Sequence, residues 1–342
     1  MIVYKYRSGR GSKDNKGRDI FERDLELLSK NSIYIPTSEQ LNDPAEALVD
    51  VRNFKEILSS CKVLGVNDSI KNVEDQFSKF YSGIRSAGIY SLSKKIDNEL
   101  MWAYYASGHT GYAIIIDTDV LSRSFEYVQF GGMYEFDVNY SSKLPQFDIT
   151  KIGKEGVVKT LSCFLGNKSK AWEHEAEHRL VFDKGGKCLK IDYRAIKGFV
   201  FGYRMLEEDI DYVMKLFSGR GLEYYKIMMK ENSYQLYKEK LIDNYPSEVH
   251  YCPNHVEYDI EELLEGDKFI DGCGYKYRQF VEEALCEVSR EPFVVGISHI
   301  VVTDDQKWPH ILIWTEWNQE GSFRKMHSFE YNVIRGSLIR AN

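Results

Sequence analysis

Gly111-Tyr112-Ala113-Ile114-Ile115-Ile116-Asp117 is an unbroken run of aromatic and β-branched residues with the length of a single strand. A run without alternation of polar and apolar residues is typical of a strand whose two faces are both buried. Such a strand needs other elements packed on either side of it. The run therefore predicts the centre of a sheet inside a folded domain.

Strands and helices around this run do not alternate regularly. Before it, the sequence predicts strands at residues 2–7, 32–36 and 88–93 and helices at 19–30, 51–64, 73–82 and 98–107. After it, we expect two strands within 126–140 and a helix at 149–168. Strands at 177–182 and 188–192 are expected to form a hairpin around Lys184-Gly185-Gly186-Lys187. A strand ending at 202, a helix at 207–217 and a strand pair at 223–229 and 234–240 follow. This mixture predicts an α+β fold: a largely antiparallel mixed sheet with flanking helices.

A domain boundary is predicted at Asn244-Tyr245-Pro246-Ser247, a run of turn-forming residues. Beyond it we expect a helix near 275–290 and strands near 294–303, 310–314 and 322–329. The predicted organisation is an α+β domain at 1–245 and a smaller C-terminal α/β extension or subdomain at 246–342.

Composition excludes several classes of protein. The chain has 342 residues, of which 43% are hydrophobic and 28% charged, as in globular proteins. No run reaches the ~18–20 apolar residues of a membrane span, and the N-terminus lacks a signal-peptide core, so we expect a cytoplasmic protein without a membrane partner. The net charge of −7 gives no strong nucleic-acid signal, and six scattered cysteines without a C-x-x-C pair are expected to be reduced. The sequence leaves the oligomeric state open.

His174-Glu175-Ala176-Glu177-His178 matches the H-E-x-x-H pattern of zinc proteases. That pattern needs a helix, whereas Arg179-Leu180-Val181-Phe182 begins a strand at once. A charged glutamate also lies between the two histidines, and no third ligand is evident. A second group, His250-x-Cys252-x-x-His255, lacks the paired spacing of zinc knuckles. We therefore predict no metal site.

Several runs of the chain, taken in order, resemble a known family. They are Tyr4-Lys5-Tyr6-Arg7, Leu41-Asn42-Asp43-Pro44 with Glu46, Leu100–Tyr105 leading into Gly111, Trp172-x-x-Glu175-x-Glu177-x-Arg179, and Phe199–Arg204. Together they resemble the bacterial domain of unknown function 2971 over about residues 2–240. The family brings no established activity, although its members resemble in part proteins linked to abortive infection and phage defence. In the family the tryptophan-containing run has no need of histidines, which implies that the zinc pattern is a coincidence.

The same runs supply the candidate site residues. On a strand starting at Glu177, the side chains of Glu177 and Arg179 share one face, and Glu175 shares it if the strand extends back. We predict these three as catalytic residues, against the alternative of a surface ion-pair ladder. Predicted substrate-binding residues are Tyr4, Tyr6, Arg7, Asn42, Asp43, Ser91, Ser93, Trp102 and Tyr105. Structural alternatives are a turn for the Asn-Asp-Pro run and a core role for Trp102 and Tyr105.

Two enzymatic hypotheses follow, and one without catalysis. The first is ADP-ribosyl transfer or NAD hydrolysis by a toxin or phage-defence enzyme: the order of a first-strand polar cluster, middle-strand serines and late glutamates is loosely similar to that of ADP-ribosyltransferases. It implies a nucleotide partner, NAD⁺. The second is a magnesium-dependent nuclease that uses Asp43, Glu46, Glu175 and Glu177 as oxygen ligands, although no lysine stands beside them in sequence. The third is a binding module for a nucleotide or peptide.

Overall fold

The structure is a computed structural model that describes residues 1–63, 67–125, 133–148, 156–304, 307–318 and 325–341. Contacts within the chain form two compact units, the first ending at Glu248 and the second beginning at Val249. Each unit has its own sheet and core. In the described part of the chain, no helix combines the length and apolar character needed to cross a membrane.

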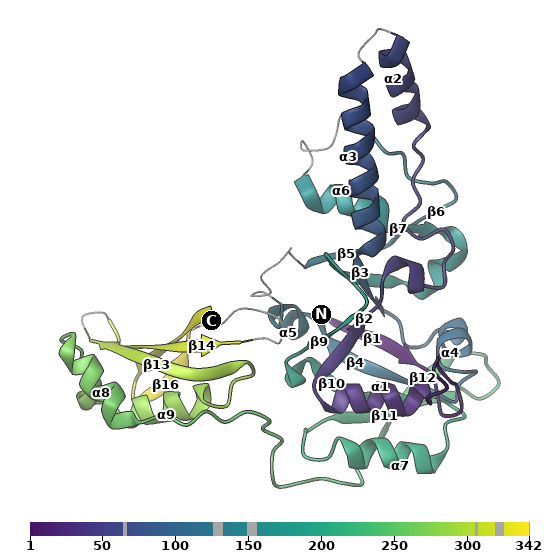
Figure 1. The fold of residues 1–342 in the computed structure, drawn as a ribbon. Helices are drawn as coiled ribbons and strands as arrows, with labels where there is room; N and C mark the ends of the chain where they lie inside the picture. Colours follow the sequence, from purple (N-terminus) through teal and green to yellow (C-terminus); the bar gives the residue numbers. More distant parts are fainter. Residues whose placement is uncertain (64–66, 126–132, 149–155, 305–306, 319–324, 342) are drawn as a thin grey trace. The chain divides into compact units, whose positions relative to one another are not determined.

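The first unit is built on an eight-stranded sheet (Figure 1). Its strands, in spatial order, are β12 (Leu236–Leu241), β11 (Glu223–Met229), β10 (Ile196–Phe201), β4 (Tyr112–Asp117), β1 (Ile2–Arg7), β3 (Gly88–Ser93), β8 (Glu177–Phe182) and β5 (Tyr134–Asp137). Neighbouring strands are antiparallel except β10 and β11, which are parallel. The predicted α+β class with a largely antiparallel mixed sheet is confirmed.

Strand β4 lies at the centre of this sheet, as its sequence predicts, and is buried on both faces. On one face, Tyr112 contacts Phe21 of α1 (Ile20–Ser29). The same face carries Phe199, which packs on Phe217 at the end of α7 (Glu207–Leu216). On the opposite face, residues of the sheet pack with Trp102 of α4 (Glu99–Tyr105).

The sheet is nearly divided between β1 and β3. Six residue pairs join β1 to β4, and six join β3 to β8. In contrast, β1 and β3 share a single pair in register, Tyr4 with Ser93. The two strands therefore diverge beyond this pair, and their facing edges border the site described below.

The strands on either side of Gly185 and Gly186 do not pair with each other as the hairpin prediction requires. Strand β9 (Lys187–Lys190) pairs with β2 (Ser32–Ile35), whereas β8 pairs with β3 and β5. The amide of Gly186 donates to the carbonyl of Ile35 at 2.7 Å, and the amide of Gly185 donates to the carbonyl of Ser86 at 2.9 Å. These long-range bonds direct the chain away from β8, so the hairpin prediction is wrong although both strands exist.

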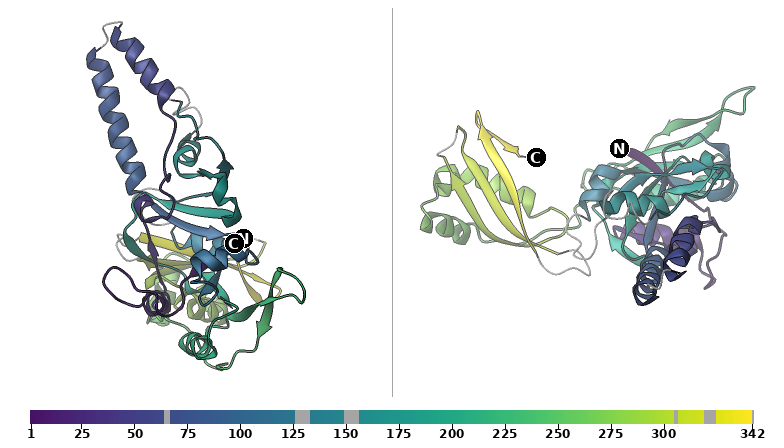
Figure 2. Two further views of the ribbon diagram at one scale, coloured as in Figure 1. Left: turned by 90° about the vertical axis from the view of Figure 1, so that its right-hand side faces the viewer. Right: turned by 90° about the horizontal axis from the view of Figure 1, so that it is seen from above.

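The remaining elements of the first unit flank the sheet. They are η1 (Ser38–Gln40), α2 (Arg52–Val63), α3 (Asn67–Ser86), α5 (Thr118–Arg123), β6 (Asn139–Ser141), α6 (Gly156–Leu165), β7 (Asn167–Ser169), η3 (Lys170–Glu175) and η4 (Tyr193–Ala195). Helices α2 and α3 pack side by side through Phe54 and Phe77 and project from the sheet (Figure 2). Parts of the strands and helix predicted at 126–140 and 149–168 lie outside the described residues.

The second unit is a four-stranded antiparallel sheet covered by helices (Figures 1 and 2). Its elements are α8 (Ile260–Phe269), η5 (Gly274–Tyr277), α9 (Arg278–Val288), β13 (Val294–Thr303), β14 (His310–Trp317), β15 (Lys325–Ile334) and β16 (Ser337–Arg340). Along β14 buried and half-buried residues alternate, so one face packs against the helices. Helix α8 and strand β16 were not predicted, and part of the strand predicted at 322–329 lies outside the described residues.

Candidate functional site

A cavity of about 440 Å³ lies beside the junction of β1 and β3. It is entirely within the first unit. Its walls come from β1, β3, α1, α4, the η1 region, β7 and the segment that leads into β8. The lining residues are Tyr4, Lys5, Tyr6, Arg7, Ser8, Ile20, Arg23, Asp24, Tyr34, Pro36, Gln40, Leu41, Asn42, Ser91, Leu92, Ser93, Met101, Tyr104, Tyr105, Lys168, Glu175 and Glu177.

Nine of the twelve residues that the sequence singles out line this cavity. They are Tyr4, Tyr6, Arg7, Asn42, Ser91, Ser93, Tyr105, Glu175 and Glu177. These residues are up to 173 positions apart in the chain and come from six separate parts of the fold: β1, the turn after η1, β3, α4, η3 and β8. Their spatial convergence is established by the geometry, whereas their roles in binding or catalysis stay predictions.

The two glutamates are positioned by a break between η3 and β8. Ala176 adopts a left-handed conformation with φ 44°, which ends η3 and starts the strand. Ser93 Oγ donates to the carbonyl of Glu175 at 2.6 Å, and the amide of Glu177 donates to Tyr140 Oη at 2.8 Å. The backbone on both sides of Ala176 is therefore held in place, and both carboxylates reach the cavity wall.

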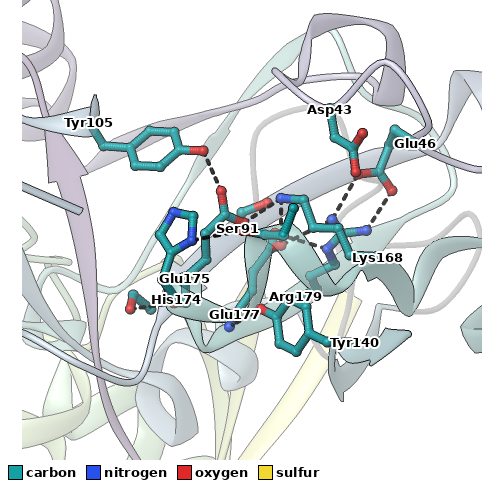
Figure 3. Close-up of polar contacts among 12 residues, drawn as sticks. Asp43, Glu46, Ser91, Tyr105, Tyr140, Lys168, His174, Glu175, Glu177 and Arg179 are labelled. Carbon is teal, nitrogen blue, oxygen red and sulfur yellow. Dashed lines mark hydrogen bonds and ion pairs between the residues drawn. The ribbon is translucent and has the colours of Figure 1, made fainter. Parts of the chain in front are cut away.

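Glu175 has two side-chain partners (Figure 3). The Tyr105 hydroxyl donates to Glu175 Oε1, and Lys168 Nζ donates to Glu175 Oε2. Burial raises the pKa of Glu175 above its ordinary value, and this effect exceeds the opposite effects of Lys168 and Tyr105. Glu175 is therefore a carboxyl group able to take up a proton more readily than an exposed glutamate.

Glu177 has a different electrostatic environment. Arg179 donates to both of its oxygens, from Nε to Oε1 at 2.9 Å and from Nη2 to Oε2 at 3.1 Å, and Lys168 Nζ lies 3.2 Å from Oε2. Although burial favours the protonated form, the charges of Arg179 and Lys168 lower the pKa of Glu177 to about 2. Glu177 is thus a permanent anion that orients the two cations.

Three predicted residues do not line the cavity. Arg179 is fully buried behind Glu177, where it also makes a bidentate ion pair with Glu46 at 2.6 and 2.8 Å. Asp43 is buried in its turn, and its Oδ1 accepts from the amide of Ala45 at 2.9 Å. Trp102 is a core residue whose Nε1 donates to the carbonyl of Ile96 at 2.6 Å. These positions favour the structural alternatives for Asp43 and Trp102, and they exclude an exposed ion-pair ladder for Arg179.

A cationic group forms another part of the cavity wall. Arg7 and Arg23 line it together with Lys5, and Asp24 lies between the two arginines. Asp24 Oδ1 accepts from Arg23 Nη2 at 2.7 Å, and its Oδ2 lies 3.5 Å from Arg7 Nε. The two guanidinium groups and the one carboxylate of Asp24 leave a net positive charge on this part of the wall, which suits an anionic group of a ligand.

The two histidines of the zinc-like pattern lie in different elements. His174 is on η3, and its Nδ1 is 3.1 Å from the carbonyl of Ala171. His178 is on β8, where its two ring nitrogens contact Asp137 at 2.9 Å and Glu135 at 2.8 Å. Among the residues that the structure describes, no three histidine, cysteine or carboxylate groups are arranged to hold a metal ion.

Lys168 is the main site residue that the sequence analysis missed. It bridges Glu175 and Glu177 and lies 5.0 Å from the centre of the Trp172 ring. It stands seven residues before Glu175, on the short strand β7, so no alternation along β8 points to it. Its nearness in sequence to Trp172, a residue of the family run, is a weak local signal.

Comparison with known proteins bears on part of this unit. Residues 101–180 match the family model described as "Protein of unknown function (DUF2971)". This match supports the family resemblance and includes Tyr105, Lys168, Glu175, Glu177 and Arg179. Neither the search of curated proteins nor the search of solved structures found a match.

Proposed function

We propose that the first unit binds a nucleotide in the cavity beside β1 and β3 and cleaves its N-glycosidic bond, with NAD⁺ as the substrate. The observation that carries this proposal is the buried Glu175 carboxyl, with its raised pKa, in one cavity with tyrosines and arginines. A cavity of about 440 Å³ lies within the ~300–1,000 Å³ range of small-molecule sites.

The lining supports binding of a nucleotide. Tyr4, Tyr34 and Tyr104 offer aromatic faces on which a base or nicotinamide ring can stack. Arg7 and Arg23 supply guanidinium groups, which match the geometry of phosphate oxygens. The proposal therefore assigns phosphate to the arginines and the ribose to the part of the wall formed by Glu175.

The chemistry assigned to Glu175 is general-base catalysis. The bond between ribose C1 and the nicotinamide nitrogen breaks with both electrons going to the ring, which leaves as neutral nicotinamide. Water attacks C1 and passes a proton to Glu175, so the products are ADP-ribose, nicotinamide and a proton. Glu177 would stay ionised and hold Lys168 beside Glu175. Of the three residues predicted as catalytic, this assignment keeps Glu175 in that role and makes Glu177 and Arg179 positioning residues.

The nuclease hypothesis has less support. Glu46 and Glu177 are both bound to Arg179, and Asp43 stabilises its own turn. Of the four carboxylates assigned to magnesium, only Glu175 and Glu177 line the cavity, so Asp43 and Glu46 do not face a ligand bound there. A role as a toxin or in phage defence, in the cytoplasm, is part of the proposal because NAD⁺ cleavage would deplete the cell of that nucleotide.

The test is incubation of the full chain with NAD⁺, with nicotinamide release followed by chromatography and binding followed by calorimetry. We expect Glu175→Gln to bind NAD⁺ and to release nicotinamide at least about 10²-fold more slowly, as for the loss of a general base. The matched control is Glu208→Gln on the exposed surface of α7, which should keep the wild-type rate. Binding without any release by the wild type would favour the binding-module hypothesis, and absence of binding would refute the proposal.

A further inference from the structure

Lys5 places a primary amine beside the junction of the two diverging strands. Its Nζ donates to the carbonyl of Ser91 on β3 at 2.6 Å, so the side chain of Lys5 crosses from β1 to β3. The ring of Tyr90 lies 4.7 Å from the same nitrogen. Lys5 also lines the cavity, together with Arg7 and Glu175. No step of the proposed cleavage uses this amine.

The amine of Lys5 differs from those of exposed lysines. Burial and the neighbouring charge of Arg7 lower the pKa of Lys5 to about 7, although Glu177, Asp24 and Glu175 act in the opposite direction. Near pH 7.5 the amine of Lys5 is therefore neutral in a large fraction of the molecules. An exposed lysine with a pKa of about 10.4 is almost wholly protonated at that pH. Neutral lysine amines in apolar surroundings are nucleophiles toward carbonyl carbons.

We propose that Lys5 forms an imine with the C1 aldehyde of a ribose phosphate bound in the cavity. As a statement about the natural ligand, this inference rests on the proposed function, since cleavage of NAD⁺ gives a ribose whose C1 opens to an aldehyde. Lys5 Nζ attacks C1 to give a carbinolamine. The C1 oxygen then leaves as water, after taking one proton from the nitrogen and one from the carboxyl of Glu175. The product is a protonated imine, which keeps the second proton of the nitrogen, and Glu175 is left as a carboxylate.

The surroundings of Lys5 suit this ligand class. The guanidinium groups of Arg7 and Arg23 border the same cavity and can hold the phosphate. Glu175 is in the same cavity, and its raised pKa makes it a suitable donor for the departing oxygen. Lys168, the other lysine of the wall, is held between two carboxylates and lacks the open position of a nucleophile.

The experiment uses ribose 5-phosphate and the full chain, so that capture is measured without cleavage. Sodium cyanoborohydride reduces an imine to a stable secondary amine, and peptide mass spectrometry locates it. At pH 7.5 we expect Lys5 to be labelled more than about tenfold faster than the exposed Lys13, because a larger fraction of the Lys5 amine is neutral than is usual for an exposed lysine. Labelling of Lys5 should rise with pH around a midpoint near 7. Lys5→Arg should lose it, and Lys13→Arg should retain it.

The outcomes separate this inference from the proposed function. Selective labelling of Lys5 without nicotinamide release from NAD⁺ would support the imine and refute the cleavage. Nicotinamide release with Lys5 labelled no faster than Lys13 would refute the imine and leave the cleavage standing. The pH profile is measured on the wild type, so the inference remains falsifiable even if Lys5→Arg fails to fold.

Discussion

Replacing Arg179 by methionine removes the cation that neutralises two buried carboxylates. The side chain of Arg179 is 0% exposed, and those of Glu46 and Glu177 are 3% and 4% exposed. Arg179 Nη1 also donates to the carbonyl of Leu165 at 2.5 Å. Methionine fills a similar volume but supplies no donor. The variant therefore removes this partner from Glu46 and from the carbonyl of Leu165, and leaves Glu177 with Lys168 as its remaining cation.

Loss of one partner from a buried ion pair costs about 3–5 kcal/mol, because the remaining charge stays out of water. We expect Arg179→Met to lower the free energy of unfolding of the first unit by that amount at pH 7. This is a large share of the ~5–15 kcal/mol that stabilises a typical domain. The matched control is Arg52→Met, whose ion pair with Asp50 involves an arginine side chain that is 83% exposed. This substitution should leave the free energy of unfolding nearly unchanged, because solvent screens an exposed pair.

The pH dependence gives a sharper test. In the wild type, the pKa of Glu177 is about 2 in the folded state and 4.5 in a model peptide. Its contribution to stability is therefore present above about pH 4.5 and is lost as the pH falls toward 2. In Arg179→Met, the burial of Glu177 without the arginine should raise the pKa of this glutamate. Acidification from pH 7 should therefore reduce the difference in stability between the variant and the wild type.

The chain has two compact units, so a signal from the whole chain would mix their unfolding. The stability of the first unit is therefore measured by amide hydrogen exchange of peptides from β3 and β8. The assigned role of Arg179 would be refuted if Arg179→Met lowered the free energy of unfolding by less than about 1 kcal/mol. It would also be refuted if the difference from the wild type grew as the pH fell from 7 to 5.

Three further outcomes are expected. Gly198→Ala should destabilise the β10–β11 pair by at least about 1–3 kcal/mol, because the added Cβ would lie 1.9 Å from the carbonyl oxygen of Glu223, and thermal unfolding would measure it. Between about pH 7 and 10.5 the unfolded wild type keeps a proton on Lys5 that the folded chain has released, so the free energy of unfolding should rise with pH. This rise should be absent from Lys5→Met, and urea titrations across the range would measure it. The carboxylate of Asp267 accepts from the amides of Val302 and Gly274, each at 2.7 Å, so Asp267→Ala should cost about 1–3 kcal/mol for each amide left without an acceptor. Hydrogen exchange should become faster in β13 and stay unchanged in β4.

Local patterns were sufficient to predict most elements of the fold. The apolar run at Tyr112–Asp117 predicts a doubly buried strand, and β4 is one. Alternation predicts that Glu177 and Arg179 share a face, and they do, since Arg179 Nε donates to Glu177 Oε1. These properties depend on residues that are neighbours in sequence, so a strand or helix carries them wherever it lies.

Pairing partners and charge environments could not be predicted in the same way. The two glycines after β8 are typical of a hairpin, yet bonds to Ile35 and Ser86 direct the chain to β2. The cavity depends on where β1 and β3 stop pairing, which no single segment encodes. Burial dominates the pKa of Glu175, whereas Arg179 and Lys168 outweigh burial at Glu177. Burial and the approach of Lys168 from β7 both depend on elements that lie elsewhere in the sequence.

Residue type and spacing in the sequence therefore specify which side chains share a strand face, and a local conformation is enough to do so. The tertiary structure alone specifies which faces meet, which groups lose water and which charges approach within 3 Å. Coulomb and desolvation energies depend on those distances and on burial, not on separation along the chain. For that reason, Glu175 and Glu177 are equivalent carboxylates in the sequence but differ in pKa in the folded protein.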